Sequence, residues 1–94
     1  MRSIKQTGAF KKDLKRELTG KYKFVLKEEF WDIVNLLAND LPLPEKYKDH
    51  LLAGNWQGHG ECHIRNDLLL IYLKTEEGLL YLVRLGSHSE VLKK

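Results

Sequence analysis

Histidine, the side chain best suited to proton exchange near neutral pH, gathers in this 94-residue chain. Three of the four histidines, His50, His59 and His63, lie close together in the middle of the chain, and His88 follows the last apolar run. Asp67 adds a carboxylate near them. Positioned acids and bases of this kind catalyse proton transfer. We expect His50, His63, Asp67 and His88 to meet in one site.

Cationic side chains accompany these proton carriers. Lys48, Arg65 and Arg84 could hold a phosphate group beside a proton donor and a proton acceptor. Tyr47 and Trp56 offer flat surfaces on which nucleobases could stack, although packing at the rim of the core explains Trp56 better. Taken alone, His50 or His88 is more often an exposed loop residue than a catalytic one. Their combination with the cations favours a site that acts on a phosphodiester.

A metal site is a weaker explanation of the same stretch. His59 and His63 are four residues apart, a spacing that suits two metal ligands on a helix, but Gly58 and Gly60 argue against a helix there. On an extended chain four residues span about 13 Å, too far for one ion. Cys62 is better explained as a small buried apolar residue than as a nucleophile. Since no glycine-rich phosphate loop precedes a helix, we predict neither metal nor cofactor.

Length and composition bound the class of protein. The chain, residues 1–94, is long enough for one domain with one core. One cysteine favours a reducing compartment, no apolar run approaches the ~20 residues that cross a bilayer, and the first residues lack the apolar stretch of a signal peptide. We therefore expect a cytoplasmic protein. The formal net charge of +3 is a mild bias toward polyanions that ordinary solubility explains equally well.

Apolar spacing predicts a helical first half and a strand-rich second half. We expect an edge strand at 3–7 and helices at about 8–18 and 23–39, and then strands at 50–54 (weak), 61–65, 68–73 and 79–85. This order predicts an α+β fold, in which a small antiparallel sheet of about four strands carries two N-terminal helices on one face. Trp31 lies off the apolar stripe of the second helix and is expected to cover the rim of the core.

Strand alternation predicts which side chains share a face. In the strand at 61–65, Cys62 and Ile64 should lie opposite His63 and Arg65. In the last strand, one face should carry Tyr81, Val83 and Leu85, and the other Leu80, Leu82 and Arg84. The polar positions His63, Arg65 and Arg84 should line an open face of the sheet, with Asp67 and His88 at the strand ends.

An ordered block of motifs runs through most of the chain. It comprises Leu41-Pro42-Leu43-Pro44, Tyr47-Lys48-Asp49-His50, Leu52, Gly54, Trp56, Gly58, His63-Ile64, Asp67, Leu70-Ile71-Tyr72 and Arg84-Leu85-Gly86-Ser87-His88. Together these motifs resemble the YafQ-type toxins of the RelE/ParE superfamily. The resemblance implies a ribosome-dependent endoribonuclease of a type II toxin–antitoxin pair that cuts messenger RNA in the ribosomal A site. Carried over by position, His50, His63, Asp67 and His88 match the catalytic residues, and Arg84 matches a phosphate-contacting arginine.

The chain departs from the family pattern at three places. Gly60 stands where arginine is common, Leu68 where tryptophan can stand, and Val91-Leu92 where the family often has a phenylalanine placed against a base. These departures bear on base selectivity and turnover more than on the type of reaction.

The resemblance also implies partners, namely a cognate antitoxin, the ribosome and messenger RNA, and no membrane. Candidate contacts for antitoxin or ribosomal RNA are Lys11, Lys12, Lys15 and Arg16, with a solvated helix face as an equal alternative. The competing function is a non-enzymatic inhibitor like the ParE branch, which binds DNA gyrase. The histidines favour the nuclease, because a protein that only binds has no need of them.

Overall fold

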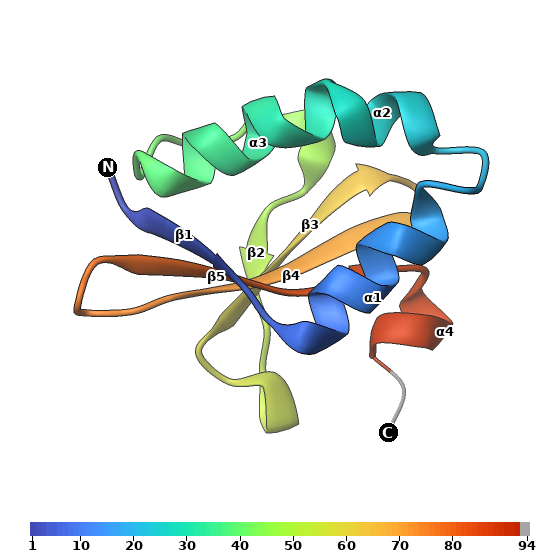
Figure 1. Cartoon of the computed structure of the whole chain (residues 1–94). Coiled ribbons are helices and arrows are strands. Elements are labelled where there is room, and N and C mark those ends of the chain that lie inside the picture. Colours follow the sequence, from blue (N-terminus) through green and yellow to red (C-terminus); the bar gives the residue numbers. More distant parts are fainter. Residues whose placement is uncertain (93–94) are drawn as a thin grey trace.

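The structure is a computed structural model that describes residues 1–92, and its centre is one sheet of five strands (Figure 1). The strands are β1 (Ser3–Gln6), β2 (His50–Leu51), β3 (His59–Arg65), β4 (Leu68–Lys74) and β5 (Leu79–Gly86). Their order is β1-β5-β4-β3-β2, with β1 parallel to β5 and every other pair antiparallel. The α+β fold is confirmed. The sheet is mixed, because the first strand of the chain pairs alongside the last.

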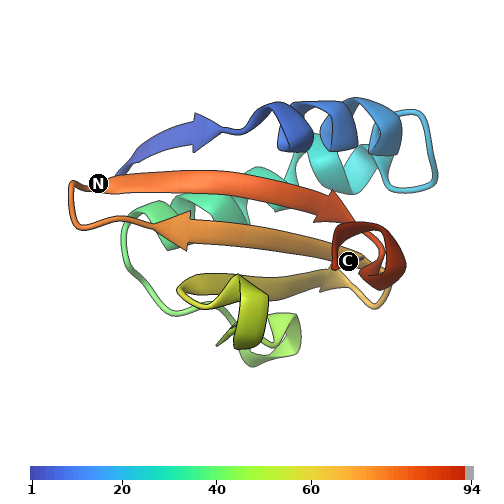
Figure 2. The same ribbon diagram turned by 90° about the horizontal axis from the view of Figure 1, so that it is seen from below.

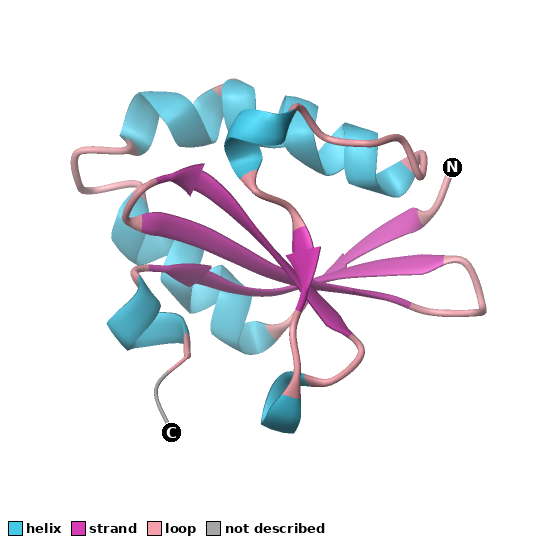
Figure 3. Cartoon of the chain, turned by 180° about the vertical axis from the view of Figure 1, so that it is seen from behind, coloured by secondary structure: helices cyan, strands magenta, loops and turns pink. Residues whose placement is uncertain are grey.

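Helices cover the sheet unequally. The helices are α1 (Gly8–Glu17), α2 (Lys23–Lys27), α3 (Glu29–Ala38) and α4 (His88–Val91), and two short 3-10 turns are η1 (Glu45–Tyr47) and η2 (Gly54–Trp56). α2 and α3 lie over one face, while α4 and η2 lie on the other (Figures 1 and 3). α1 continues the line of β1 along β5 (Figure 2). Within residues 1–92 no helix has the length and apolar character needed to cross a membrane.

The expected second helix is divided in two. Glu28 has φ −128° and ψ −77°, outside helical geometry, and its carbonyl accepts from the backbone N–H groups of Trp31 and Asp32 at the start of α3. The five-residue α2 contains Phe24 and Val25, whose helix propensity is low. α2 is therefore held in helical form by packing rather than by intrinsic propensity, and the helix breaks directly after it, at Glu28.

The main core lies between the sheet and its helices. Its helical part is built from Phe10, Leu26, Phe30, Ile33, Val34 and Leu37, and its sheet part from Cys62, Ile64, Leu68, Leu70, Tyr72, Leu80, Leu82 and Leu85. Trp31 packs edge-on against Phe30 with ring centroids 4.9 Å apart, at the rim as expected. The buried stretch of β4 confirms the expected central strand.

A second, smaller core lies on the opposite face. Leu69, Ile71 and Val91 are fully buried there, and Trp56 packs against them half-buried. Val91 comes from α4, so this cluster fixes α4 to the sheet. The expected strand at 50–54 is shorter than predicted, because Gly54 turns the chain with φ 68° into η2.

Two β-bulges decide which side chains share a face. In β5 the bulge falls at Val83, since Tyr72 pairs with Leu82 and Ile71 pairs with Arg84. The strict alternation expected for this strand was therefore wrong: Leu85 joins Leu82 in the main core. Arg84 moves to the face of Ile71, which is also the face of Glu61, because residues directly opposite one another share a face.

The bulge in β3 moves a cationic side chain away from the face that carries His63. His63 pairs with Leu69, but Arg65 pairs with Leu68, whose side chain lies in the main core. The prediction that Arg65 and His63 lie on the same face of the sheet was wrong, because the extra residue turns the Arg65 side chain toward α3.

Candidate active site

Three histidines form a row on the face of the sheet opposite α3. His50 comes from β2, His63 from β3, and His88 is the first residue of α4. The His63 ring lies in the middle, with its centroid 6.2 Å from that of His50 and 6.2 Å from that of His88. The structure thus gathers three of the four expected proton carriers.

A buried carboxylate joins two of these rings. Oε1 of Glu61 lies 3.2 Å from Nε2 of His50 and 3.2 Å from Nε2 of His63. The Glu61 side chain is only 3% exposed, and among the described residues its Oε2 has no hydrogen-bond partner. A carboxylate oxygen only accepts, so each contact is a hydrogen bond whenever the ring nitrogen carries a hydrogen. The trio is therefore built to hold and share protons.

The backbone before β2 sets the orientation of His50. Lys48 ends η1 in the left-handed region, with φ 48°, and this reversal leads the chain into the pairing of His50 with Glu61. Nδ1 of His50 lies 2.7 Å from the Lys48 carbonyl oxygen. Since a carbonyl only accepts, Nδ1 carries the hydrogen and Nε2 faces the carboxylate.

Asp67 stands apart from the histidine row. It lies in the two-residue turn between β3 and β4 and is exposed. Within residues 1–92 its carboxylate makes no ion pair and no hydrogen bond. Any catalytic part for Asp67 therefore depends on contact with a substrate that crosses this turn.

Arg84 is held by a carboxylate from α1. Its Nε lies 2.7 Å from Oδ2 of Asp13, its Nη2 lies 3.2 Å from Oδ1, and the Asp13 side chain is 4% exposed. Burial raises the pKa of Asp13, but hydrogen bonds from Arg84 and from the Leu85 backbone outweigh it and lower the pKa. Two of the five N–H bonds of a guanidinium are used in this way, which leaves the others for a phosphate.

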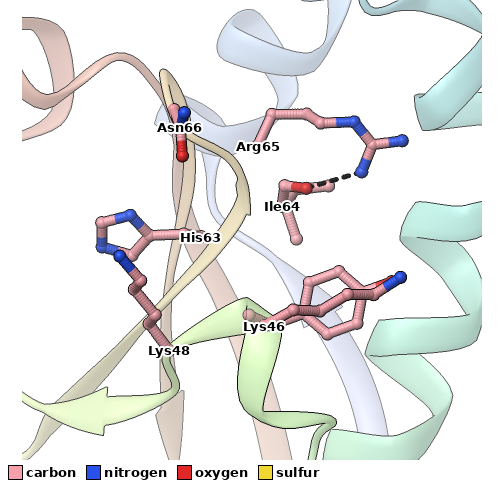
Figure 4. A pocket seen from close by; sticks show the side chains of 7 residues that line it. Lys46, Lys48, His63, Ile64, Arg65 and Asn66 are labelled. Carbon is pink, nitrogen blue, oxygen red and sulfur yellow. Dashed lines mark hydrogen bonds between the residues drawn. The ribbon is translucent and has the colours of Figure 1, made fainter.

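A cationic hollow of about 250 Å³ opens beside His63. It is lined by Lys46, Tyr47, Lys48, His63, Ile64, Arg65 and Asn66. Figure 4 shows His63 and Arg65 pointing to opposite sides of it. Arg65 is tied to Glu29 on α3 through two contacts of 2.9 and 3.0 Å, so Lys48, on the side of His63, is less restrained than Arg65.

Several other expected residues have structural places. Tyr47 is buried, so its ring offers little surface on which a base could stack. Its hydroxyl donates to Oε2 of Glu29 at 2.5 Å, and burial together with this bond raises its pKa to about 12. Cys62 is fully buried, as predicted, and burial raises the pKa of its thiol. His59 faces Trp56 at 5.2 Å between ring centroids. Within residues 1–92, no three His, Cys, Asp or Glu side chains are grouped to hold a metal ion.

The three departures from the family pattern lie in packed surroundings. A Cβ at Gly60 would come 2.3 Å from the Tyr72 ring, whose hydroxyl donates to Asp49 at 2.5 Å. Leu68 and Val91 are fully buried, one in each core. At these positions the chain uses apolar contacts inside the protein. Leu92 packs half-buried against the second core.

Sequence reasoning missed Glu61 and Asp13. Glu61 stands two residues before His63, and that spacing on a strand places both side chains on one face, which was the available signal. Asp13 stands three residues before Arg16, an ordinary surface pair on a helix. Nothing in its spacing indicates that it reaches β5.

Comparison with known proteins identifies the family. Residues 2–93 match the family described as the bacterial toxin of type II toxin-antitoxin system, YafQ. The chain belongs to the YafQ toxin family. The resemblance proposed from the motifs is therefore confirmed.

YafQ relatives match over nearly their whole length. The chain is 37% identical over 93 residues to the putative toxin YafQ of Haemophilus influenzae, covering 92% of this chain and 91% of that protein. It is 38% identical over 88 residues to the mRNA interferase toxin YafQ of Escherichia coli K12, covering 94% and 92%.

Solved structures of bacterial toxins share the fold. A copper-bound mutant toxin from Helicobacter pylori superposes with a TM-score of 0.89 at 33% identity, covering 97% of this chain and 99% of that one. In the E. coli DinJ-YafQ complex, the matching chain gives a TM-score of 0.79 at 37% identity, covering 97% and 98%.

Proposed function

We propose that this YafQ-family chain is an mRNA interferase, the toxin of a type II toxin–antitoxin pair, that cuts messenger RNA in the ribosomal A site. The observation that carries the proposal is the histidine row, in which two imidazoles share one buried carboxylate oxygen and a third ring lies beside them. A site of this composition moves protons. The family match supplies the substrate class, because a relative is named an mRNA interferase.

The reaction is attack of an RNA 2′-hydroxyl on its own 3′-phosphate. The bond from the 2′ oxygen to phosphorus forms and the bond from phosphorus to the 5′ oxygen of the next nucleotide breaks. A base takes the 2′ proton and an acid gives a proton to the leaving 5′ oxygen. The products are a 2′,3′-cyclic phosphate and a 5′-hydroxyl, so atoms and protons balance without a further reactant.

His88 is the proposed acid, because its ring is exposed and stands at the end of the row. The base is His50 or Asp67. His50 can take the proton on Nε2, where the Glu61 carboxylate stabilises the resulting imidazolium, and Asp67 is an exposed carboxylate with no described partner. His63 and Glu61 orient and share the proton. Arg84 stabilises the negative charge that develops on the oxygens around phosphorus, an electrostatic role that fixed cations serve well.

The cationic hollow suits the phosphates that neighbour the cut. Lys48 and Arg65 line it together with His63, and Lys46 adds a third positive charge, which supports their proposed contact with RNA phosphates. The ribosome would align the 2′-hydroxyl, so a protein this small need not grip RNA tightly alone.

Partners follow from the same function. A relative in this family is named in complex with DinJ, which supports a cognate antitoxin for this chain as well. The ribosome and messenger RNA complete the set, in the cytoplasm, with residues 1–94 acting as one toxin domain. The family match favours cleavage over the gyrase-binding alternative.

The test is in vitro translation with cleavage sites mapped by primer extension. His50→Ala and His88→Ala should each cut messenger RNA about 10² to 10⁴ times more slowly than the parent, since that is the usual contribution of a positioned acid or base. His59→Ala is the matched control, because His59 packs on Trp56 outside the row, and it should cut at the parental rate. Parental cleavage by His88→Ala would contradict the acid assignment. Intact messenger RNA with altered DNA supercoiling would instead support the gyrase alternative.

A further inference from the structure

The position of His88 depends on a helix that is too short to be stable without tertiary contacts. α4 has only four residues, far too few to be stable alone. His88 is exposed, and within residues 1–92 its side chain makes no hydrogen bond or ion pair. The position of its ring is therefore set by the backbone at the start of α4.

Glu90 fixes that start from within α4. Its Oε1 accepts from the Ser87 backbone N–H at 3.1 Å and from the Ser87 hydroxyl at 3.0 Å. This reciprocal capping box encloses His88, which lies directly after Ser87. Anything that holds the Glu90 carboxylate consequently holds His88.

Arg16 of α1 reaches this carboxylate from outside. Its Nε donates to Oε2 of Glu17 at 3.0 Å and also forms an ion pair with Oε2 of Glu90, 3.5 Å away. Nη2 donates to the Leu85 carbonyl oxygen at 3.0 Å and Nη1 to Asp13 at 3.0 Å. One guanidinium therefore contacts α1, the end of β5 and α4. The Arg16 side chain is nevertheless 41% exposed, so its candidate role as a contact for antitoxin or ribosomal RNA stays a prediction beside these internal contacts.

Gly86 shows how closely these parts approach. It is the last residue of β5 and directly precedes the capping box, with φ 153°, and a Cβ there would lie 2.7 Å from Nη2 of Arg16 and 3.0 Å from Oε1 of Glu90. Glycine at this position leaves room for the Arg16 guanidinium and the Glu90 carboxylate to approach the backbone just before His88.

We propose that Arg16 is a positioning residue for His88, tying α1 to the start of α4 and so setting where the His88 ring stands relative to His63. The proposal rests on the proposed role of His88 as the acid. Asp13 binds Arg16 and Arg84 at once. The same network therefore sets the phosphate-binding cation and the acid relative to each other.

The first test is Arg16→Met, which keeps the length of the side chain and removes its hydrogen bonds. Misplacement of a catalytic group by about 1 Å can cost ~10²-fold in rate, so we expect kcat on translating ribosomes to fall by about that factor with KM little changed. The NMR signal of the His88 ring should move and that of His50 should stay. Arg2→Met is the matched control, since Arg2 likewise joins an aspartate to a carbonyl oxygen, at the far end of β5.

Glu90→Gln provides a second variant that keeps the fold. Glutamine can complete the capping box, so only the ion pair with Arg16 is lost. It should slow cleavage less than Arg16→Met, and the double variant should be no slower than Arg16→Met alone, because both act through one contact.

The outcomes separate the two proposals. If His88→Ala is slow while Arg16→Met cleaves at the parental rate with unchanged His88 signals, the positioning role is wrong and the proposed function stands. If His88→Ala itself cleaves normally, the acid assignment and the positioning role both fail.

Discussion

Single side chains in this protein do more than their place in the sequence indicates. Glu61 is the clearest case, because a carboxylate buried between two imidazoles is costly unless it is paired with both. Gly60, its neighbour, leaves room for the Tyr72 ring, which covers the strand where a side chain would otherwise stand. Glu61 thus places a carboxylate in the site, and the preceding Gly60 leaves room for the Tyr72 ring on the opposite face of the strand.

Glu61→Gln tests the shared carboxylate. The amide is the same size, but it cannot hold the negative charge that both imidazoles face. We expect cleavage to slow by about tenfold or more. The melting temperature should not fall, since an incompletely paired buried charge is removed. Cleavage and thermal melting measure the two effects, with Glu77→Gln in an exposed turn as control. A variant that melts earlier yet cuts normally would show that Glu61 serves the fold alone.

At the scale of elements, ion pairs join parts that are distant in sequence. Glu29 on α3 accepts hydrogen bonds from Arg65 on β3 and from Tyr47 on η1. Hydrogen bonds from Arg65 and then from Tyr47 lower its pKa from 4.5 to about 2. The helix layer is thereby fastened to the edge of the sheet beside the cationic hollow.

This contact predicts a pH dependence of stability. A depressed carboxyl pKa stabilises the folded state above the unfolded value of 4.5, and the stabilisation is lost as pH falls toward about 2. Glu29→Gln should therefore lower the free energy of unfolding at pH 7, and the difference from the parent should vanish near pH 2. Urea unfolding across this range measures it. A difference independent of pH would mean that the charge of Glu29 contributes nothing.

The elements show which parts of the fold the sequence could predict. Local apolar spacing was enough for α1, for the stretch that became α2 and α3, and for β3, β4 and β5, since each pattern reports burial of one face. It could not reveal the bulges at Val83 and next to Arg65, because alternation assumes an uninterrupted ladder. The break at Glu28 was hidden for a related reason, as apolar residues on both sides face the same core.

The site was predictable in part for the same reasons. His50, His63 and His88 came from residue chemistry and from the resemblance, and the structure brings their rings together. The partners that hold site residues in place, Asp13 for Arg84 and Arg16 for α4, come from a helix far away in sequence. Tertiary contacts of this kind leave no local pattern.

At the scale of the whole molecule, the first strand of the chain pairs with the last. β1 pairs with β5 from Ser3↔Leu79 to Gln6↔Leu82, and Arg2 donates to the Thr75 carbonyl oxygen. Thr7 extends this connection, since its hydroxyl donates to the Val83 carbonyl oxygen and caps α1. The first residues therefore cover an edge of β5 that would otherwise be open.

Removal of residues 1–6 should expose that edge. Unpaired N–H and C=O groups on a strand with apolar neighbours favour association with other chains. We expect a lower melting temperature and oligomers in size-exclusion chromatography. Phe24→Ser, which alters a 74% exposed apolar side chain on α2, should melt like the parent and elute with it. A shortened chain that stays monomeric with an unchanged melting temperature would show that β5 needs no partner at this edge.

The pairing of β1 with β5 also sets an order in time. Synthesis delivers β1 and α1 first, but their partners β5 and α4 come last, together with His88. While the C-terminus is still being made, the N-terminal strand has nothing to pair with and the third imidazole does not yet exist. The complete histidine row can consequently assemble only after the last elements of the chain have been synthesised.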